Sequence, residues 1–172
     1  MNIRNFEFKA KVDELSPYEN MLLRLQPVFR GTDLQTDTYF NVKRGRLKLR
    51  EGNIENALIS YNRADVADSK EAEIMLYRHS PDKALKDILV NQLGVKTIVR
   101  KTRKIYFLDN VKFHFDIIDG LGTFIEVEAI DEKNEFTAEQ LKNQCDRYFD
   151  FFGLRKDQLI DRSYSDLLEK GI

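Results

Sequence analysis

The chain of 172 residues is long enough to enclose one hydrophobic core, and no shift in composition marks a linker, so we expect a single domain over residues 1–172. Its 28 basic and 29 acidic side chains give a formal net charge of -1, which does not indicate a nucleic-acid-binding surface. The single cysteine, Cys145, excludes an internal disulfide framework. No stretch is long and apolar enough for a membrane span, so the expected location is the cytoplasm.

Alternation of apolar and charged residues predicts eight strands. In the first, over residues 3–12, Phe6 and Phe8 share one face and Glu7 and Lys9 share the other. The remaining strands are expected at 34–42, 46–50, 57–63, 71–77 and 96–108, and in the two arms of a hairpin over 113–128 that turns at 120–122.

Helix-start patterns predict three helices and a short helical tail. Ser16, Ser80 and Thr137 are the expected N-caps, and proline follows the first two at the first helical position. Glycine marks the expected C-terminal ends. The helices are expected from 16 to about 31, from 80 to 94 and from 137 to 153, and the tail from about 156.

The hairpin carries closely spaced acidic residues. Glu126 and Glu128 are two positions apart on one strand, so their carboxylates lie side by side, and Asp116 lies on the neighbouring arm. Adjacent like charges repel unless a cation or basic groups neutralise them. A solvated edge strand paired with Lys101 or Arg103 would give the same pattern, so a cation site and an ordinary surface remain alternatives.

Amphipathic helices must bury their apolar stripes, and the apolar faces of the strands are the available partners. The charged faces would then turn inward as the sheet curls. We therefore expect an α+β fold, an eight-stranded antiparallel β-barrel that forms a tunnel with a charged lumen and has helices packed outside. A half-solvated sheet has the same alternation and remains the other interpretation.

Basic side chains on several strands would hold a polyanion, because guanidinium groups fork onto phosphate oxygens. The basic candidates are Lys9, Lys11, Arg46, Lys48, Arg50, Arg63, Lys101 and Arg103. The acidic candidates are Glu7, Asp116, Glu126 and Glu128. Carboxylates would repel a polyanion unless Mg²⁺ or Mn²⁺ bridged the two. The combination predicts metal-dependent phosphoryl chemistry on a polyphosphate.

Four stretches also carry a family likeness. They are Glu7-Phe8-Lys9-Ala10-Lys11, Leu47-Lys48-Leu49-Arg50, Arg100-Lys101-Thr102-Arg103 and the hairpin from Asp116 to Glu128 with its Gly-Leu-Gly turn. With them the chain resembles, along essentially its whole length, the CYTH superfamily of class IV adenylate cyclases, thiamine triphosphatases and inorganic triphosphatases. The resemblance implies a triphosphate tunnel that takes a nucleoside triphosphate, inorganic triphosphate or thiamine triphosphate together with a divalent metal.

The resemblance also implies residue roles. Metal ligands would be Glu7, Glu126 and Glu128, with Asp116 at an acidic position often seen before the turn. Phosphate contacts would come from Lys11, Lys48, Arg50, Lys101 and Arg103, and from Arg63, whose register the sequence does not fix. Lys11 and Arg50 are the catalytic candidates.

One residue departs from the family pattern. Lys9 replaces the second glutamate of the Glu-x-Glu-x-Lys signature, which should weaken any second metal. The leading hypothesis is an adenylate-cyclase-like or triphosphatase-like enzyme that depends on Mg²⁺ or Mn²⁺. The alternatives are a triphosphate-binding module without turnover and a plain scaffold domain. No nucleic-acid or membrane partner is expected, and a homodimer is compatible with the sequence.

Three further positions have no role in that hypothesis. His114 shares a strand face with Asp116 and is either a proton shuttle or ligand, or a structural histidine. Cys145 lies among apolar helical residues and is interpreted as a buried, inert thiol. Ser163 and Tyr164 in the tail are interpreted as packing residues.

Overall fold

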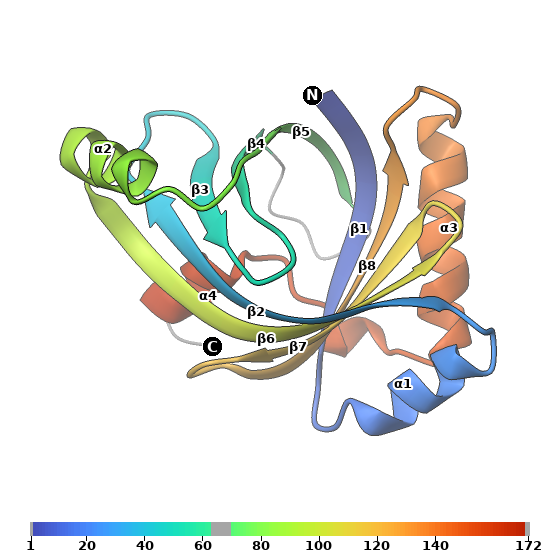
Figure 1. Cartoon of the computed structure of the whole chain (residues 1–172). Helices are drawn as coiled ribbons and strands as arrows, with labels where there is room; N and C mark the ends of the chain where they lie inside the picture. Colours follow the sequence, from blue (N-terminus) through green and yellow to red (C-terminus); the bar gives the residue numbers. More distant parts are fainter. Residues whose placement is uncertain (1, 63–69, 171–172) are drawn as a thin grey trace.

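The strands form a closed eight-stranded barrel in which each neighbour pairs antiparallel, in the order β1-β5-β4-β3-β2-β6-β7-β8 (Figure 1). The computed structural model describes residues 2–62 and 70–170. The strands are β1 (Asn2–Val12), β2 (Val28–Phe40), β3 (Arg46–Glu51), β4 (Ala57–Asn62), β5 (Lys70–Arg78), β6 (Val95–Leu108), β7 (Val111–Ile118) and β8 (Gly122–Asp131). The helices are α1 (Ser16–Leu23), α2 (Lys83–Leu93), α3 (Ala138–Phe151), the 3-10 turn η1 (Lys156–Gln158) and α4 (Tyr164–Lys170).

The main hydrophobic core lies outside the barrel, between its wall and α3. Phe6 and Phe8 point outward from β1 and belong to one buried cluster with Leu141 and Cys145 of α3, and Figure 1 shows α3 running beside β1 and β8. The Cys145 thiol donates a hydrogen bond to the Phe6 carbonyl oxygen at 3.2 Å. Cys145 is buried, as predicted, and burial raises the pKa of its thiol to about 12, which disfavours the reactive thiolate.

A second apolar cluster lies at one end of the barrel interior. Tyr164 and Leu167 of α4 pack there against Val99 of β6 and Phe124 of β8. Val99 shares the inward face of β6 with Lys101, because strand side chains alternate. The C-terminal helix therefore contacts the inside of the barrel wall, whereas α3 covers its outside.

The first helix is shorter than the sequence predicted. α1 ends at Leu23, and β2 already begins at Val28, so the expected extension to about Gly31 is wrong. The cause is Pro27, which has no N–H to continue a helix and disfavours helical geometry at the residue before it. Gln26, the residue before Pro27, has a left-handed φ of 54° and has therefore left helical geometry.

The helix caps agree only in part with the predicted ones. The capping box of Thr137 and Gln140 is present at the start of α3. Leu15 occupies the N-cap of α1 in place of Ser16, and the Asp82 carboxylate caps α2 in place of Ser80. α2 covers the barrel only loosely, because none of its residues is fully buried and the apolar stripe of Leu85, Leu89 and Leu93 is half-buried. Within residues 2–62 and 70–170, no helix combines the length and apolarity that a bilayer span requires.

Candidate functional site

A cavity of about 760 Å³ lies inside the barrel. Its lining is asymmetric. Strands β4 and β5 contribute apolar side chains such as Ile59, Ile74 and Leu76. β5 also contributes Arg78, and the remaining strands contribute charged side chains of both signs, which are Glu7, Lys9, Lys48, Arg50, Lys101, Arg103, Lys112, Glu126, Glu128 and Asp131. The predicted charged lumen is therefore present, with one apolar wall.

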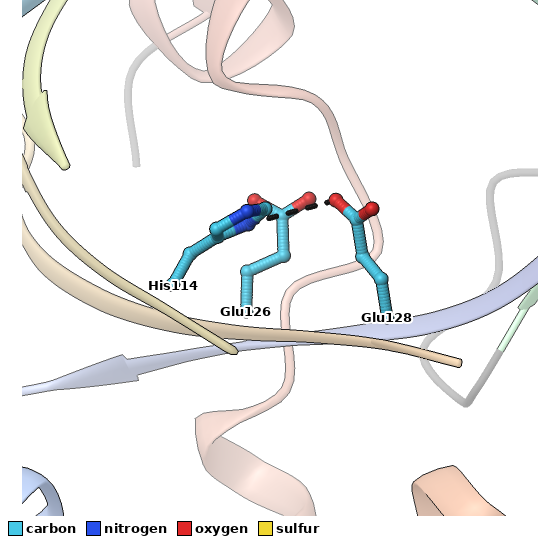
Figure 2. A group of neighbouring side chains, drawn as sticks. All are labelled: His114, Glu126 and Glu128. Atoms are coloured by element: carbon cyan, nitrogen blue, oxygen red, sulfur yellow. Dashed lines mark ion pairs between the residues drawn. The ribbon is translucent and has the colours of Figure 1, made fainter. Parts of the chain in front are cut away.

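Three potential metal ligands meet on two adjacent strands. His114 of β7 lies directly opposite Glu126 in the strand pairing, and Glu128 follows two positions later on β8. Figure 2 shows the three side chains pointing the same way from the sheet. One ligand atom from each lies within 4.8 Å of the others. The distance from His114 Nδ1 to Glu128 Oε1 is 3.6 Å, which is too long for a hydrogen bond.

The His114 imidazole is fully buried, with 0% of its surface exposed. Neither ring nitrogen has a hydrogen-bond partner among the residues that the structure describes. Burial lowers the pKa of His114 well below its ordinary value, and the charges of Arg103 and Lys112 lower it further. The ring is therefore neutral at pH 7, with one nitrogen available as an electron-pair donor.

The two glutamates of this group have opposite electrostatic surroundings. Burial would raise the pKa of Glu126, but the charges of Lys9 and Arg103 outweigh burial and hold this pKa well below its ordinary value. Burial raises the pKa of Glu128, and the neighbouring Glu126 charge raises it further. Glu126 is thus a stable anion, whereas Glu128 lacks a cation close enough to offset its desolvation.

Arg103 is held by two carboxylates, and Tyr164 supports one of them. Its Nε and Nη2 atoms donate to the two carboxylate oxygens of Asp116 at 2.7 and 2.5 Å, and Nη2 also donates to Glu126 at 2.8 Å. The Tyr164 hydroxyl donates to Asp116 Oδ2 at 2.8 Å. Asp116 is not part of the cavity lining. The structure therefore places this predicted metal ligand behind Arg103, where it orients the guanidinium.

A second cationic group surrounds Asp37 of β2. Arg50 donates to both Asp37 oxygens at 2.9 and 3.0 Å, Lys101 approaches Oδ2 at 2.8 Å and Lys48 approaches it at 3.1 Å. Burial would raise the pKa of Asp37, but the charges of Arg50, Lys101 and Lys48 hold it well below its ordinary value. One buried carboxylate thus gathers three of the predicted phosphate-binding residues.

Glu55 links this group to the side of the cavity that carries Glu126 and Glu128. Its carboxylate accepts from Arg50 Nη1 at 3.1 Å and from Lys112 Nζ at 2.5 Å. Burial would raise the pKa of Glu55, but Lys112 and Arg50 lower it far below its ordinary value. Lys112 lies opposite Glu128 in the strand pairing.

The two signature residues on β1 lie close to the acidic pair. Glu7 lines the cavity and pairs with Glu128 in register. Lys9 pairs with Glu126, and its Nζ lies 3.7 Å from Glu126 Oε2. Lys9 therefore places a cation beside the carboxylates, at the position where the family signature has a second glutamate.

Two predicted substrate contacts are not brought to the cavity. Lys11 and Arg46 are not among its lining residues. The Lys11 ammonium lies 5.9 Å from the centre of the Phe124 ring, and Arg46 forms an ion pair with Asp166 at 2.7 Å. Arg63 lies outside the described residues.

Some site residues were missed from the sequence. Asp37 continues an inward run with Asp33 and Gln35, and this run of polar residues at alternate positions was a readable signal. Tyr164 gave no such signal, because its strand contacts depend on how the tail packs. Glu55 lies between two strands, so its direction depends on the loop conformation.

The comparisons with known proteins agree with this geometry. A family model described as the CYTH domain matches residues 4–144. A protein of Methanocaldococcus jannaschii, provisionally named an adenylate cyclase, is 25% identical over 176 residues, which cover 94% of this chain and 96% of that protein. A solved structure from Pyrococcus horikoshii OT3 has a TM-score of 0.80 at 22% identity, over 95% of this chain and 98% of that chain.

A further solved structure, from Vibrio parahaemolyticus and also provisionally named an adenylate cyclase, has a TM-score of 0.72 at 20% identity. It matches over 96% of this chain and 97% of that chain. Identities this low show a shared fold and no more. The family model, in contrast, spans most of the sequence, and the chain belongs to the CYTH domain family.

Proposed function

We propose that this protein is a divalent-metal-dependent enzyme that acts on an organic triphosphate such as ATP. The observation that carries the proposal is the juxtaposition, in one cavity, of the Glu126–Glu128 pair and the inward cations Arg50, Lys101 and Arg103. Neither set alone indicates a polyphosphate. Together they fit an anion that arrives with a metal.

The residues present fit Mg²⁺ or Mn²⁺. Two adjacent carboxylates and a buried imidazole without a hydrogen-bond partner in the described chain are a suitable donor set. When bound, the cation would neutralise phosphate charge and polarise the reacting phosphorus–oxygen bond. Glu126 and Glu128 are the residues that would hold it, and His114 lies beside them.

The cations would bind and orient the phosphate chain. Arg103 and Arg50 are each held by a carboxylate, through Asp116 and Asp37 respectively. A guanidinium has five N–H donors, so such a bond fixes its direction and leaves donors for phosphate oxygens. The arginines are thus preorganised, which is how proteins supply most of the catalysis in phosphoryl transfer.

The apolar wall favours an organic triphosphate over the inorganic one. Ile59, Ile74 and Leu76 face the cavity from β4 and β5. Inorganic triphosphate has no group that gains from contact with them, whereas a nucleobase or thiamine ring would bury apolar surface there.

The names of the M. jannaschii and V. parahaemolyticus proteins favour nucleotide cyclisation. In that reaction the 3′-oxygen bonds to the α-phosphorus, the bond from that phosphorus to the departing pyrophosphate breaks, and the hydroxyl proton is lost to solvent. Hydrolysis of the terminal phosphate is the other outcome that the same cavity would permit.

The test is product analysis of the purified protein with Mn²⁺ or Mg²⁺ and, in turn, ATP, thiamine triphosphate and inorganic triphosphate. We expect cyclic nucleotide and pyrophosphate from ATP. Arg50→Met should lower kcat/KM by about 100-fold. Lys83→Met removes a cation that is exposed on α2 and should leave the rate unchanged. If none of the three substrates is converted, the enzyme proposal fails.

A non-catalytic triphosphate-binding module is the second candidate, and Lys9 supports it. Its ammonium lies 3.7 Å from Glu126 and adds a positive charge where a second metal would need an anion. Phosphates could then bind firmly without activation of a nucleophile. Calorimetry separates the candidates, because metal-dependent ATP binding without any product supports the module, and product formation rejects it.

A further inference from the structure

His114 is a buried polar side chain whose hydrogen-bonding capacity is unused within the described residues. It is 0% exposed, and neither ring nitrogen has a hydrogen-bond partner in the part of the chain that the structure describes. Buried polar atoms nearly always have a partner, so such an atom indicates an ion or a water molecule. Figure 2 shows the ring directed at the two glutamates and away from the sheet.

A bound cation explains both the imidazole without a hydrogen-bond partner within residues 2–62 and 70–170 and the adjacent carboxylates, whereas a water molecule explains only the imidazole. Water would satisfy the imidazole, but it would leave the Glu128 carboxylate beside the Glu126 anion without a cation to offset the repulsion. Among the described residues, Glu128 forms no ion pair with any lysine or arginine. A dication relieves the repulsion between the carboxylates and also accepts the nitrogen electron pair.

The spacing suits a shared ion. Two ligand atoms that each lie about 2.1 Å from one ion are at most about 4.2 Å apart. The three ligand atoms already lie within 4.8 Å of one another, so a small inward movement of flexible glutamate side chains is sufficient. His114 itself need not move far, because its strand partner is Glu126.

We propose that His114 is a nitrogen ligand of the metal, and that the His114–Glu126–Glu128 group prefers a first-row transition metal such as Mn²⁺ to Mg²⁺. Imidazole is a softer ligand than carboxylate, and Mg²⁺ favours oxygen. The inference deepens the proposed function, because it gives the ligand set and metal preference of the same site. Metal binding can be measured without any triphosphate.

The experiment is pulsed electron paramagnetic resonance of Mn²⁺ bound to the full chain, with Mn²⁺ and Mg²⁺ affinities measured by titration. We expect ¹⁴N coupling from a directly bound imidazole and Mn²⁺ affinity at least about tenfold above that for Mg²⁺. His114→Gln should abolish the ¹⁴N coupling and lower the affinity for Mn²⁺ by about tenfold or more, with little effect on the affinity for Mg²⁺.

The chain has two histidines, so His79→Gln is the matched control and should keep the coupling. Circular dichroism melting shows whether each variant is folded. Glu126→Gln leaves His114 in place and should lower the affinity for both Mn²⁺ and Mg²⁺. The proposal is overturned if the folded wild-type protein binds Mn²⁺ through oxygen alone, or if folded His114→Gln binds Mn²⁺ as tightly. Nitrogen coupling without turnover would reject the proposed enzyme activity and support His114 as a metal ligand. Turnover with oxygen-only coordination would support the enzyme activity and reject His114 as a ligand.

Discussion

Lys9 is the residue at which binding and catalysis make opposite demands. Its Nζ atom lies 3.7 Å from Glu126 and 4.2 Å from the centre of the Tyr164 ring, so a buried cation links β1, β8 and α4. Such a cation stabilises the carboxylate without a metal. It also competes with a metal for the same oxygen.

We predict that Lys9→Glu raises Mn²⁺-dependent turnover and Mn²⁺ affinity, because the substitution replaces a competing cation with a potential ligand. The metal-free variant should be less stable than the wild-type protein by about 3 kcal/mol, since it leaves Glu126 partly unpaired and adds a like charge. Steady-state kinetics and urea unfolding, each with and without Mn²⁺, measure these effects.

Lys9→Met is the control, because it removes the competing cation without adding a carboxylate. Its metal affinity should lie between those of the wild-type protein and Lys9→Glu. Turnover of Lys9→Glu at or below the wild-type rate would show that Lys9 does not limit this protein.

Individual site residues could be predicted only where the signal was local. Glu126 and Glu128 are two apart on one strand, so their shared face follows from the sequence. The grouping of Asp37 with Lys101 depends on the pairing of β2 with β6, and the meeting of His114 with Glu126 depends on hairpin register. Whether a strand face points to solvent or to a lumen is a property of the closed barrel.

α4 links the end of the chain to the centre of the site. Tyr164 packs against Phe124, and its hydroxyl donates to Asp116, which in turn holds Arg103. Tyr164 therefore acts on the cavity through other residues and is a positioning residue. The tail has a structural connection to the phosphate-binding side chains.

We predict that Tyr164→Phe loosens Arg103 and raises KM for the triphosphate several-fold, with a smaller change in kcat. The free energy of unfolding should fall by about 2 kcal/mol, because Asp116 loses a buried hydrogen bond to a charged acceptor. Kinetics and urea unfolding measure the two effects. Equal KM values in variant and wild-type proteins would contradict the positioning role, whatever the change in stability.

Tyr148→Phe is a suitable control for this variant, since that ring packs with Phe113 in the outer core. It removes a tyrosine hydroxyl at a position that does not line the cavity. Its KM should match that of the wild-type protein.

The elements were predicted well where the pattern repeats along several residues. The alternation in β1 and the hairpin of β7 and β8 was sufficient to place these strands. The end of α1 was missed because apolar spacing continues past Leu23, while a single residue, Pro27, ends the helix. α2 was placed correctly, but none of its residues is fully buried, since amphipathic spacing does not determine how deeply a helix is covered.

The barrel as a whole holds charges of both signs inside, and this arrangement makes its stability depend on pH. The pKa of Asp37 and that of Glu55 are depressed by the lysines and arginines around them. A depressed carboxylate pKa contributes stability above the ordinary pKa of the group, and the contribution is lost as the pH falls below that value.

We predict that the free energy of unfolding falls steadily below about pH 4.5, the ordinary value for Glu55. Asp37→Asn should cost about 3 to 5 kcal/mol at pH 7, because three cations lose a buried partner. The cost should shrink towards pH 3 as Asp37 becomes protonated in the unfolded wild-type protein. Urea unfolding between pH 3 and pH 7 measures both.

Asp87→Asn is the control, since its carboxylate is half exposed on α2 and pairs only with Lys83 in the described structure. Its unfolding curve should follow that of the wild-type protein at every pH. A cost of Asp37→Asn that stays constant with pH would show that the carboxylate charge is not the source of the stability.

The barrel closes through its first and eighth strands, and this has a consequence for synthesis in the cell. Lys9 on β1 meets Glu126 on β8, so the two halves of the acidic site come from strands that are far apart in the sequence. A chain emerging from the ribosome exposes the charged face of β1 long before its partner strand exists. The site therefore assembles only after β8 has been synthesised, and contacts of such long sequence separation form slowly. Fragments that end before β8 would have neither a closed wall nor a metal site.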